Sequence, residues 1–128
     1  QFGCGFTKTS FMQPESGFER LVHIRDSIHR TFRHVEGMDH EEFSTDEKTI
    51  DVVIKCLLII GEAARNVPQD MRASNPEVPW QDTIGMRNRL IHVYFEMDLG
   101  IVWQTVSEDL LLLEDAVQKL IDSTSSSE

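Results

Sequence analysis

Residues Asp46–Arg65 read DEKTIDVVIKCLLIIGEAAR and contain the longest apolar run of the chain, Cys56–Ile60. Apolar residues recur here at intervals of three and four, which is the period of an α-helix. They cover a face wide enough for a helix at the centre of a core. Gly61 and the Ala63–Ala64 pair carry little side chain, so we expect a second helix to approach closely at this point. The segment predicts the central helix of the fold.

The ends of this helix are marked by local signals. The carboxylate of Asp46 interacts favourably with the dipole of a helix that starts there. Val67 is followed by Pro68, and a residue before proline avoids the helical conformation. We therefore expect the helix to run from Asp46 to just before Val67.

Three further long helices follow from the same period. Ser16 and Glu19 form a capping box for a helix that ends at Gly37, with the stripe Phe18, Leu21, Val22, Arg25, Ile28, Phe32 and Val35. A third helix starts near Pro79–Trp80 and runs to about Tyr94, followed by the connector Phe95–Met97. Asp98 caps a fourth, from Leu99 to about Asp122, with the apolar positions Ile101, Val102, Val106, Leu110, Leu113, Val117, Leu120 and Ile121. Short extra helical turns are expected at Asp39–Thr45 and Pro68–Ser74. Because the chain shows no strand pattern, we predict an all-α, up-down antiparallel four-helix bundle.

Length and composition limit the class of protein. The chain has 128 residues, a formal net charge of -10 and two cysteines. We expect one domain at 16–122, an N-terminal extension at 1–15 that is foreign or poorly conforming (Met12 is a candidate natural start), and a flexible tail at 123–128. No apolar run approaches the roughly 20 residues of a membrane span, and we find no secretory signal. A cytoplasmic protein with reduced thiols is expected, and the acidity argues against coating nucleic acid by bulk charge.

A local exception to this acidity is Gly85–Tyr94, which reads GMRNRLIHVY. It holds two arginines, an asparagine, a histidine and the only tyrosine of the chain, without an acidic residue. On a helix, Arg87 and Tyr94 fall within roughly 20° of each other, and Asn88 and His92 share a face. Leu90 and Ile91 point elsewhere and anchor the segment in the core. This polar edge is the candidate site.

The spacing Arg-(four residues)-His-(one residue)-Tyr, with Asn directly after Arg, resembles the signature of the HepT-like toxins, a branch of the HEPN superfamily. The resemblance covers roughly Ser16–Asp122 and extends to other segments in the expected order: Glu36–Met38, Asp46–Thr49, Ile59–Ala64, Pro79–Trp80 and Asp98–Trp103. It implies a HEPN-like helical fold, a homodimer in which two motifs line one composite cleft, and Arg87, Asn88 and His92 as catalytic residues of a ribonuclease.

The chemistry of these residues suits RNA cleavage without a metal or cofactor, because the 2′-hydroxyl of RNA is a built-in nucleophile. His92 titrates near neutral pH and suits proton transfer. Arg87 offers a planar fork to phosphate oxygens, Asn88 suits holding either the imidazole or the phosphate, and Arg89 adds positive charge for substrate binding. Cleavage needs both a base and an acid, whereas one chain supplies one motif histidine. Two facing copies of the chain would supply both groups.

Tyr94 has a separate expected role. The resemblance implies a nucleotidyltransferase antitoxin that transfers AMP onto this tyrosine and silences the nuclease, as in a type VII-like toxin–antitoxin pair. Each AMP places a phosphate charge where substrate would bind. The alternative is a partly buried tyrosine that uses its hydroxyl as a polar tip.

Several alternatives stay open. The spacings of His23, His29, His34 and His40 do not place two imidazoles at i and i+4, so we expect no metal site. The arginines of the first helix suit either a path for RNA or an ordinary solvated face, and Glu62 suits either orienting Arg87 or a surface position. The alternative function is a non-catalytic helical module that binds a nucleotidyltransferase.

Overall fold

The computed structural model describes residues 16–96 and 98–126, with the side chains of 91–96 and 125–126 left out. Within these ranges the regular secondary structure is entirely helical. The elements are α2 (Gly17–Val35), α3 (His40–Ser44), α4 (Glu47–Arg65), α5 (Gln69–Ser74), α6 (Trp80–Glu96), α7 (Leu99–Gln104), the π-helical turn η1 (Thr105–Asp109) and α8 (Leu110–Ser126).

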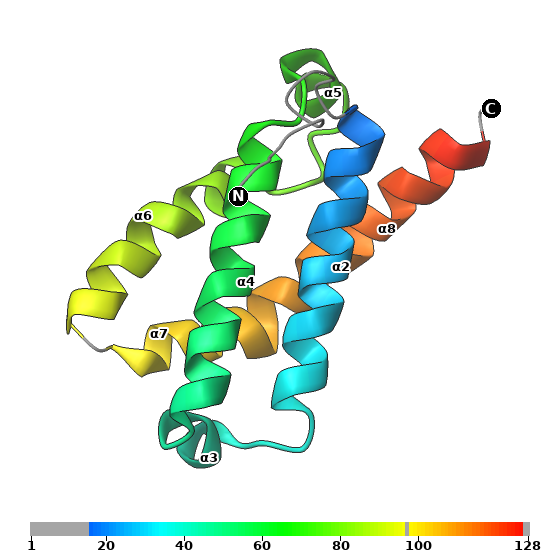
Figure 1. Ribbon diagram of the computed structural model, residues 1–128. Helices are drawn as coiled ribbons and strands as arrows, with labels where there is room; N and C mark the ends of the chain where they lie inside the picture. Colours follow the sequence, from blue (N-terminus) through cyan, green and yellow to red (C-terminus); the bar gives the residue numbers. More distant parts are fainter. Residues whose placement is uncertain (1–15, 97, 127–128) are drawn as a thin grey trace, which may run out of the picture.

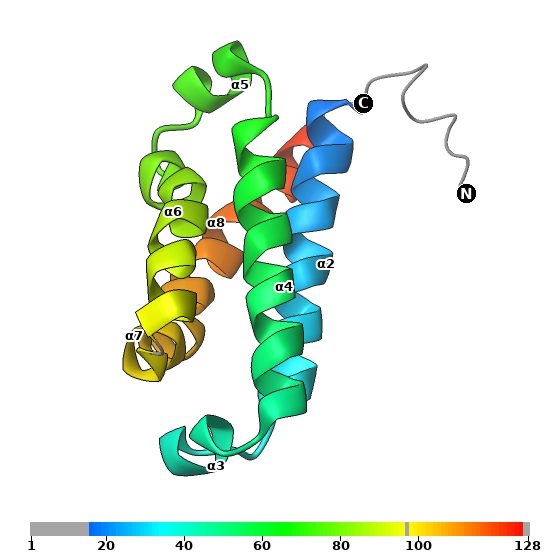
Figure 2. The same cartoon turned by 60° about the vertical axis from the view of Figure 1, so that its left-hand side comes forward.

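The long helices form an up-down antiparallel bundle. α4 packs between α2 and α6, and the segment α7–η1–α8 crosses behind this layer, where α8 contacts α2 (Figure 1). The short helices α3 and α5 lie at opposite ends of the bundle (Figure 2). The predicted all-α bundle with short extra helical turns is therefore confirmed. None of the described helices is long and apolar enough to span a membrane.

The predicted helix starts are confirmed by their hydrogen bonds. The Ser16 hydroxyl oxygen accepts from the Glu19 amide at 3.1 Å, and the Glu19 carboxylate accepts from the Ser16 amide at 2.8 Å. Asp46 accepts from the amide of Thr49 at 3.1 Å. Gly37, after the end of α2, has φ 79°, a conformation that glycine adopts without strain. These local contacts satisfy backbone groups that a helix end leaves without partners.

The core centres on α4, where Val53, Leu57 and Ile60 are fully buried. The stripe predicted for the first helix was partly wrong. Ile24 and Thr31 are buried in it, whereas Arg25 forms an ion pair with Asp26 (Nη2–Oδ1 3.3 Å).

Thr31 enters the core without leaving a polar group unsatisfied. Its hydroxyl donates to the Ser27 carbonyl oxygen at 3.0 Å, one turn back on the same helix. Burying a polar group costs stability mainly when the group lacks a hydrogen bond. The burial of Thr31, which the sequence did not predict, therefore costs the fold little stability.

The fourth long helix differs from its prediction in two ways. The π-helical turn η1 interrupts it, and the hydroxyl of Thr105 donates to the Ile101 carbonyl oxygen at 3.0 Å. Such turns carry an extra residue in the helix and are often found at functional sites. Ile101, predicted in the core, is 42% exposed, because α7 leaves part of its surface uncovered beside α6.

Two helices also end later than predicted. α6 continues to Glu96 and α8 to Ser126. The residues after the predicted ends include neither glycine nor proline, so nothing in the local sequence stops the helix. Met97, the rest of the predicted connector, lies outside the described residues, as do residues 1–15 and 127–128.

Candidate functional site

The candidate site lies on α6, and the start of this helix is fixed by hydrogen bonds. The indole nitrogen of Trp80 donates to the Asn75 carbonyl oxygen at 2.9 Å, and the hydroxyl of Thr83 donates to the Pro79 carbonyl oxygen at 2.7 Å. Trp80 and Thr83 are both buried. These contacts set the position and the direction of α6 before the motif begins.

Met86 and Leu90 anchor the motif itself. Both are 4% exposed and belong to the main core cluster. Leu90 therefore has the anchoring role predicted for it, whereas the side chain of Ile91 lies outside the described residues. With 86 and 90 turned inward, the intervening positions 87–89 are held at the surface.

Gly61 on α4 determines how closely α6 approaches. A Cβ atom at this glycine would lie 3.2 Å from the Thr83 carbonyl oxygen and 3.8 Å from the Cβ of Arg87. The first distance is shorter than an ordinary van der Waals contact, so a side chain at this position would press on the backbone of α6. The predicted close approach of a second helix at Gly61 is confirmed, and it places Arg87 along the flank of α6 that faces α4.

Arg87 and Asn88 are both exposed. Among the side chains that the structure describes, no carboxylate forms an ion pair with Arg87. An arginine that remains solvated and without an internal counter-ion keeps its positive charge available for an anion, and its fork suits a phosphate.

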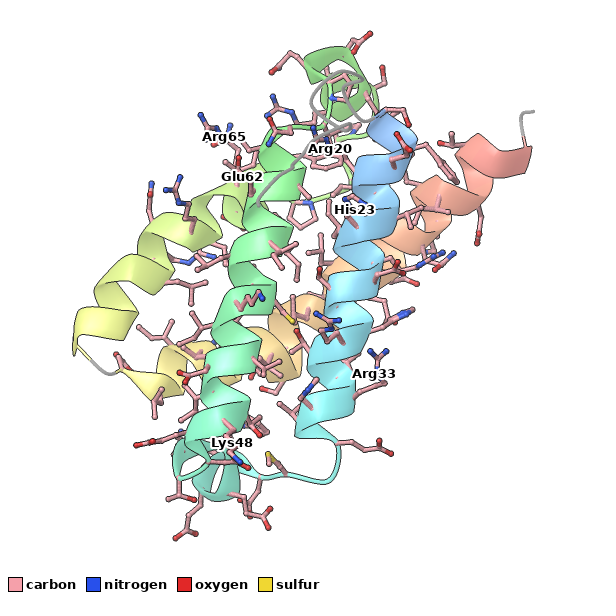
Figure 3. The ribbon with its side chains drawn as sticks, viewed as in Figure 1. Arg20, His23, Arg33, Lys48, Glu62 and Arg65 are labelled. Carbon is pink, nitrogen blue, oxygen red and sulfur yellow. The ribbon has the colours of Figure 1, made fainter. Side chains whose placement is uncertain are left out.

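Glu62 does not take the orienting role that was one of its two interpretations. Its carboxylate accepts from the side-chain amide of Asn66 at 3.1 Å and lies 3.7 Å from Nη1 of Arg65. Both partners are on α4 itself, where Figure 3 shows Glu62 and Arg65 side by side. The surface interpretation of Glu62 fits these contacts.

Arg89 lies on the other flank of α6. Its Nη2 donates to the Asp82 carbonyl oxygen at 3.1 Å, and its Nη1 would lie 3.5 Å from a Cβ at Gly85. The side chain thus folds back along its own helix and lines a groove of about 380 Å³ between α6 and α7–η1–α8. Arg87 and Arg89, two residues apart in the motif, therefore lie on different sides of the helix.

The groove beside Arg89 was not predicted. Its far wall includes Ile101 and Leu112, which are 42% and 72% exposed. A signal for it was present in the sequence: Leu110–Leu113 are four consecutive leucines, more than one helix face can bury. Leu110 and Leu113 are buried, while Leu111 and Leu112 remain at the surface.

His92 and Tyr94 lie on the part of α6 whose backbone is described, but their side chains lie outside the described residues. The roles assigned to them stay predictions. In the parts of the chain that are described, no group of three or more His, Cys, Asp or Glu side chains is placed to hold a metal ion.

The described helices form an all-α bundle of the HEPN-like type, with Arg87 and Asn88 exposed on its third long helix. Residues 24–120 match the family model described as "Ribonuclease HepT-like". The chain belongs to the ribonuclease HepT-like family.

Similar proteins occur in archaea and bacteria. "Probable ribonuclease HepT" of Thermococcus cleftensis is 45% identical over 100 residues, which cover 78% of this chain and 91% of the relative. A "Putative RNase" of Caldanaerobacter subterraneus subsp. tengcongensis is 34% identical over 101 residues, covering 79% and 90%. Another "Putative RNase", of Methanocaldococcus jannaschii, is 35% identical over 104 residues, covering 81% and 86%. No solved structure matches the chain.

Proposed function

We propose that this chain is a metal-independent endoribonuclease and the toxin of a type VII-like toxin–antitoxin pair. The observation that supports this most is the exposed Arg87 on α6, without an ion-pair partner among the described side chains, in a chain of the ribonuclease HepT-like family. The names of the relatives point to the same activity.

The proposed reaction is an internal transfer on RNA. The 2′-oxygen attacks the adjacent phosphorus and gives its proton to His92 of one copy, while the bond to the 5′-oxygen breaks. That oxygen takes a proton from His92 of the second copy, and the product is a 2′,3′-cyclic phosphate. Arg87 binds the non-bridging oxygens, whose negative charge grows in the transition state. Asn88 holds the phosphate or the imidazole.

The proposal requires a homodimer, and the surface beside α6 supports one. Ile101 of α7 and Leu112 of α8 expose apolar side chains in the groove beside the helix that carries the motif, and Leu111 is a further exposed leucine of α8. Clustered exposed apolar residues of this kind mark protein interaction sites. A second copy packed there places its α6 beside this one, and we propose that both motifs lie at the edge of that interface, where one composite cleft receives Arg87 and His92 from each copy.

Regulation by an antitoxin completes the proposal. A nucleotidyltransferase joins the Tyr94 oxygen to the α-phosphate of ATP, pyrophosphate leaves, and the phenolic proton passes to solvent. The attached AMP then brings negative charge and bulk to the motif that carries Arg87. Co-expression with the cognate transferase is expected to add mass in AMP units to the chain, and an adduct that persists on Tyr94→Phe would refute the assignment.

We place this activity in the cytoplasm, where RNA is present and where thiols stay reduced. Cys56, a free and buried thiol on α4, is compatible with that setting.

Expression in a growing cell tests the function directly. The native chain is expected to arrest growth, and His92→Ala is expected to relieve the arrest at an equal protein level. If the native chain leaves growth unaffected, and the purified dimer leaves RNA intact, the non-catalytic module that binds a nucleotidyltransferase becomes the better account.

A further inference from the structure

A second surface outside the motif has the character of an anion site. A groove of about 470 Å³ runs over the outward face of α2 and reaches Ile59 of α4. Its α2 wall includes His23, Arg30 and Arg33, and Figure 3 labels His23 and Arg33 along this helix. We call this surface the α2 groove.

The carboxylates at the α2 groove are already engaged. Asp26 lies 3.3 Å from Nη2 of Arg25, and Glu114 of α8 lies 2.7 Å from Nε2 of His29. Arg30 and Arg33 are exposed and have no ion pair with any side chain that the structure describes. The groove therefore presents two guanidinium groups that form no ion pair within the described part of the chain.

The balance of charged side chains on α2 is opposite to that of the chain as a whole. α2 holds four arginines against two carboxylates, whereas the segment from η1 to α8 holds five carboxylates against Lys119 alone, in a chain of net charge -10. A polyanion is repelled by the α8 side and attracted to α2. α2, α4 and α6 form one layer (Figure 1). A nucleic-acid strand that extends from the motif on α6 across α4 therefore reaches the α2 groove.

The lining also indicates what is bound there. None of the described residues that line the α2 groove is Phe, Tyr or Trp, the large aromatic side chains on which bases stack, and its aromatic residues are the histidines His23 and His29. Arginines that contact phosphates position a nucleic acid and carry no sequence information. The chemistry fits a phosphodiester backbone.

We propose that the α2 groove binds the backbone of the RNA substrate away from the scissile bond, with Arg30 and Arg33 as its phosphate contacts. The identity of the polyanion rests on the proposed ribonuclease function. The groove would hold long substrates on the protein while the motif on α6 acts on one phosphodiester.

The test measures RNA affinity as a function of NaCl concentration. The probe is a fully 2′-O-methylated single strand, which cannot be cleaved because its 2′-oxygens carry no proton. Arg30→Gln/Arg33→Gln is compared with Lys48→Gln/Lys119→Gln, which removes the same charge from positions that do not line the groove. Each phosphate contact on a single strand contributes about 0.7 to the slope of log K against log[salt], so the arginine variant is expected to lose about 1.4. The lysine variant is expected to keep the native slope.

An unchanged slope in the arginine variant would overturn the proposal. So would a changed oligomeric mass with an unchanged slope, since the α2 groove would then be a contact between protein chains. Cleavage of unmodified RNA by the native chain is measured in parallel. Cleavage with an unaltered slope refutes the α2 groove alone, whereas an altered slope without cleavage refutes the nuclease and leaves the groove as an RNA-binding surface.

Discussion

The position of Arg87 is set by neighbouring residues that take no part in the proposed reaction. Gly61 lets its backbone lie against α4, and the buried Met86 and Leu90 fix the rotation of α6. The guanidinium then remains exposed and without an ion pair among the described side chains. A side chain held in this way contributes to binding an anion and little to the stability of the fold.

Replacing Arg87 should therefore separate activity from stability. We expect Arg87→Ala to keep the native melting temperature, because exposed substitutions change stability by about 0.5 kcal/mol or less. RNA cleavage should fall by about 100- to 1,000-fold, the usual cost of losing one group that stabilises transition-state charge. Arg87→Lys, which keeps the charge without the planar fork, should recover part of the activity. A large drop in melting temperature would show that Arg87 is structural.

At the scale of helices, the close approach of α4 and α6 is the feature on which the site depends. Gly61 faces the backbone of α6 at Thr83 and Arg87, and it lies in the same turn of α4 as the buried Ile60 and Ala64. A larger residue would separate the two helices at the motif.

Gly61→Ala tests this contact. Alanine in place of glycine normally stabilises a helix by about 1 kcal/mol, but here the new methyl group would lie 3.2 Å from the Thr83 carbonyl oxygen. We expect no gain in melting temperature and a loss of RNA cleavage as Arg87 shifts. Gly100→Ala is the control, because its methyl group meets only Asp98, at an ordinary 3.5 Å. Equal stabilisation by both substitutions, with full activity, would show that the contact is unimportant.

The helices that the sequence predicted correctly are those whose ends and buried faces are determined by interactions between residues close together in the chain. The capping box at Ser16, the break at Pro68 and the apolar period of α4 act within a few residues, so helices α2 to α8 were largely found. The exposure of Ile101 depends on which neighbours cover α7 in space. The local sequence does not record this, because apolar residues at helical spacing look alike whether or not a partner covers them.

The sequence predicted some features of the candidate site but not the conformation of Arg89. Arg87 and Asn88 are exposed as the motif requires, since buried Met86 and Leu90 flank them. The sequence did not indicate that Arg89 turns back to the Asp82 carbonyl. That turn is a contact within α6, and the spacing of Arg87 and Arg89 in the sequence does not show which of them makes it.

For the whole molecule, the account requires two copies joined over the apolar surface of α7 and α8. Leu112 is 72% exposed at that surface, so a charge there does not disturb the core of one chain. We expect Leu112→Glu to remain folded, to have the mass of a monomer by light scattering and to lose RNA cleavage. Ala73→Glu adds the same charge on α5, at the far end of the bundle, and should stay dimeric and active. A monomeric Leu112→Glu that cleaves RNA normally would remove the need for a composite cleft.

Cleavage by Arg87 and His92 without a metal leaves a chemical signature at the ends of the RNA products. The purified chain is incubated with RNA in excess chelator, and the fragments are analysed by mass spectrometry. We expect fragments that end in a 2′,3′-cyclic phosphate, and intact RNA with His92→Ala. Intact RNA with the native chain, or fragments with 3′-hydroxyl ends that disappear in chelator, would contradict this mechanism.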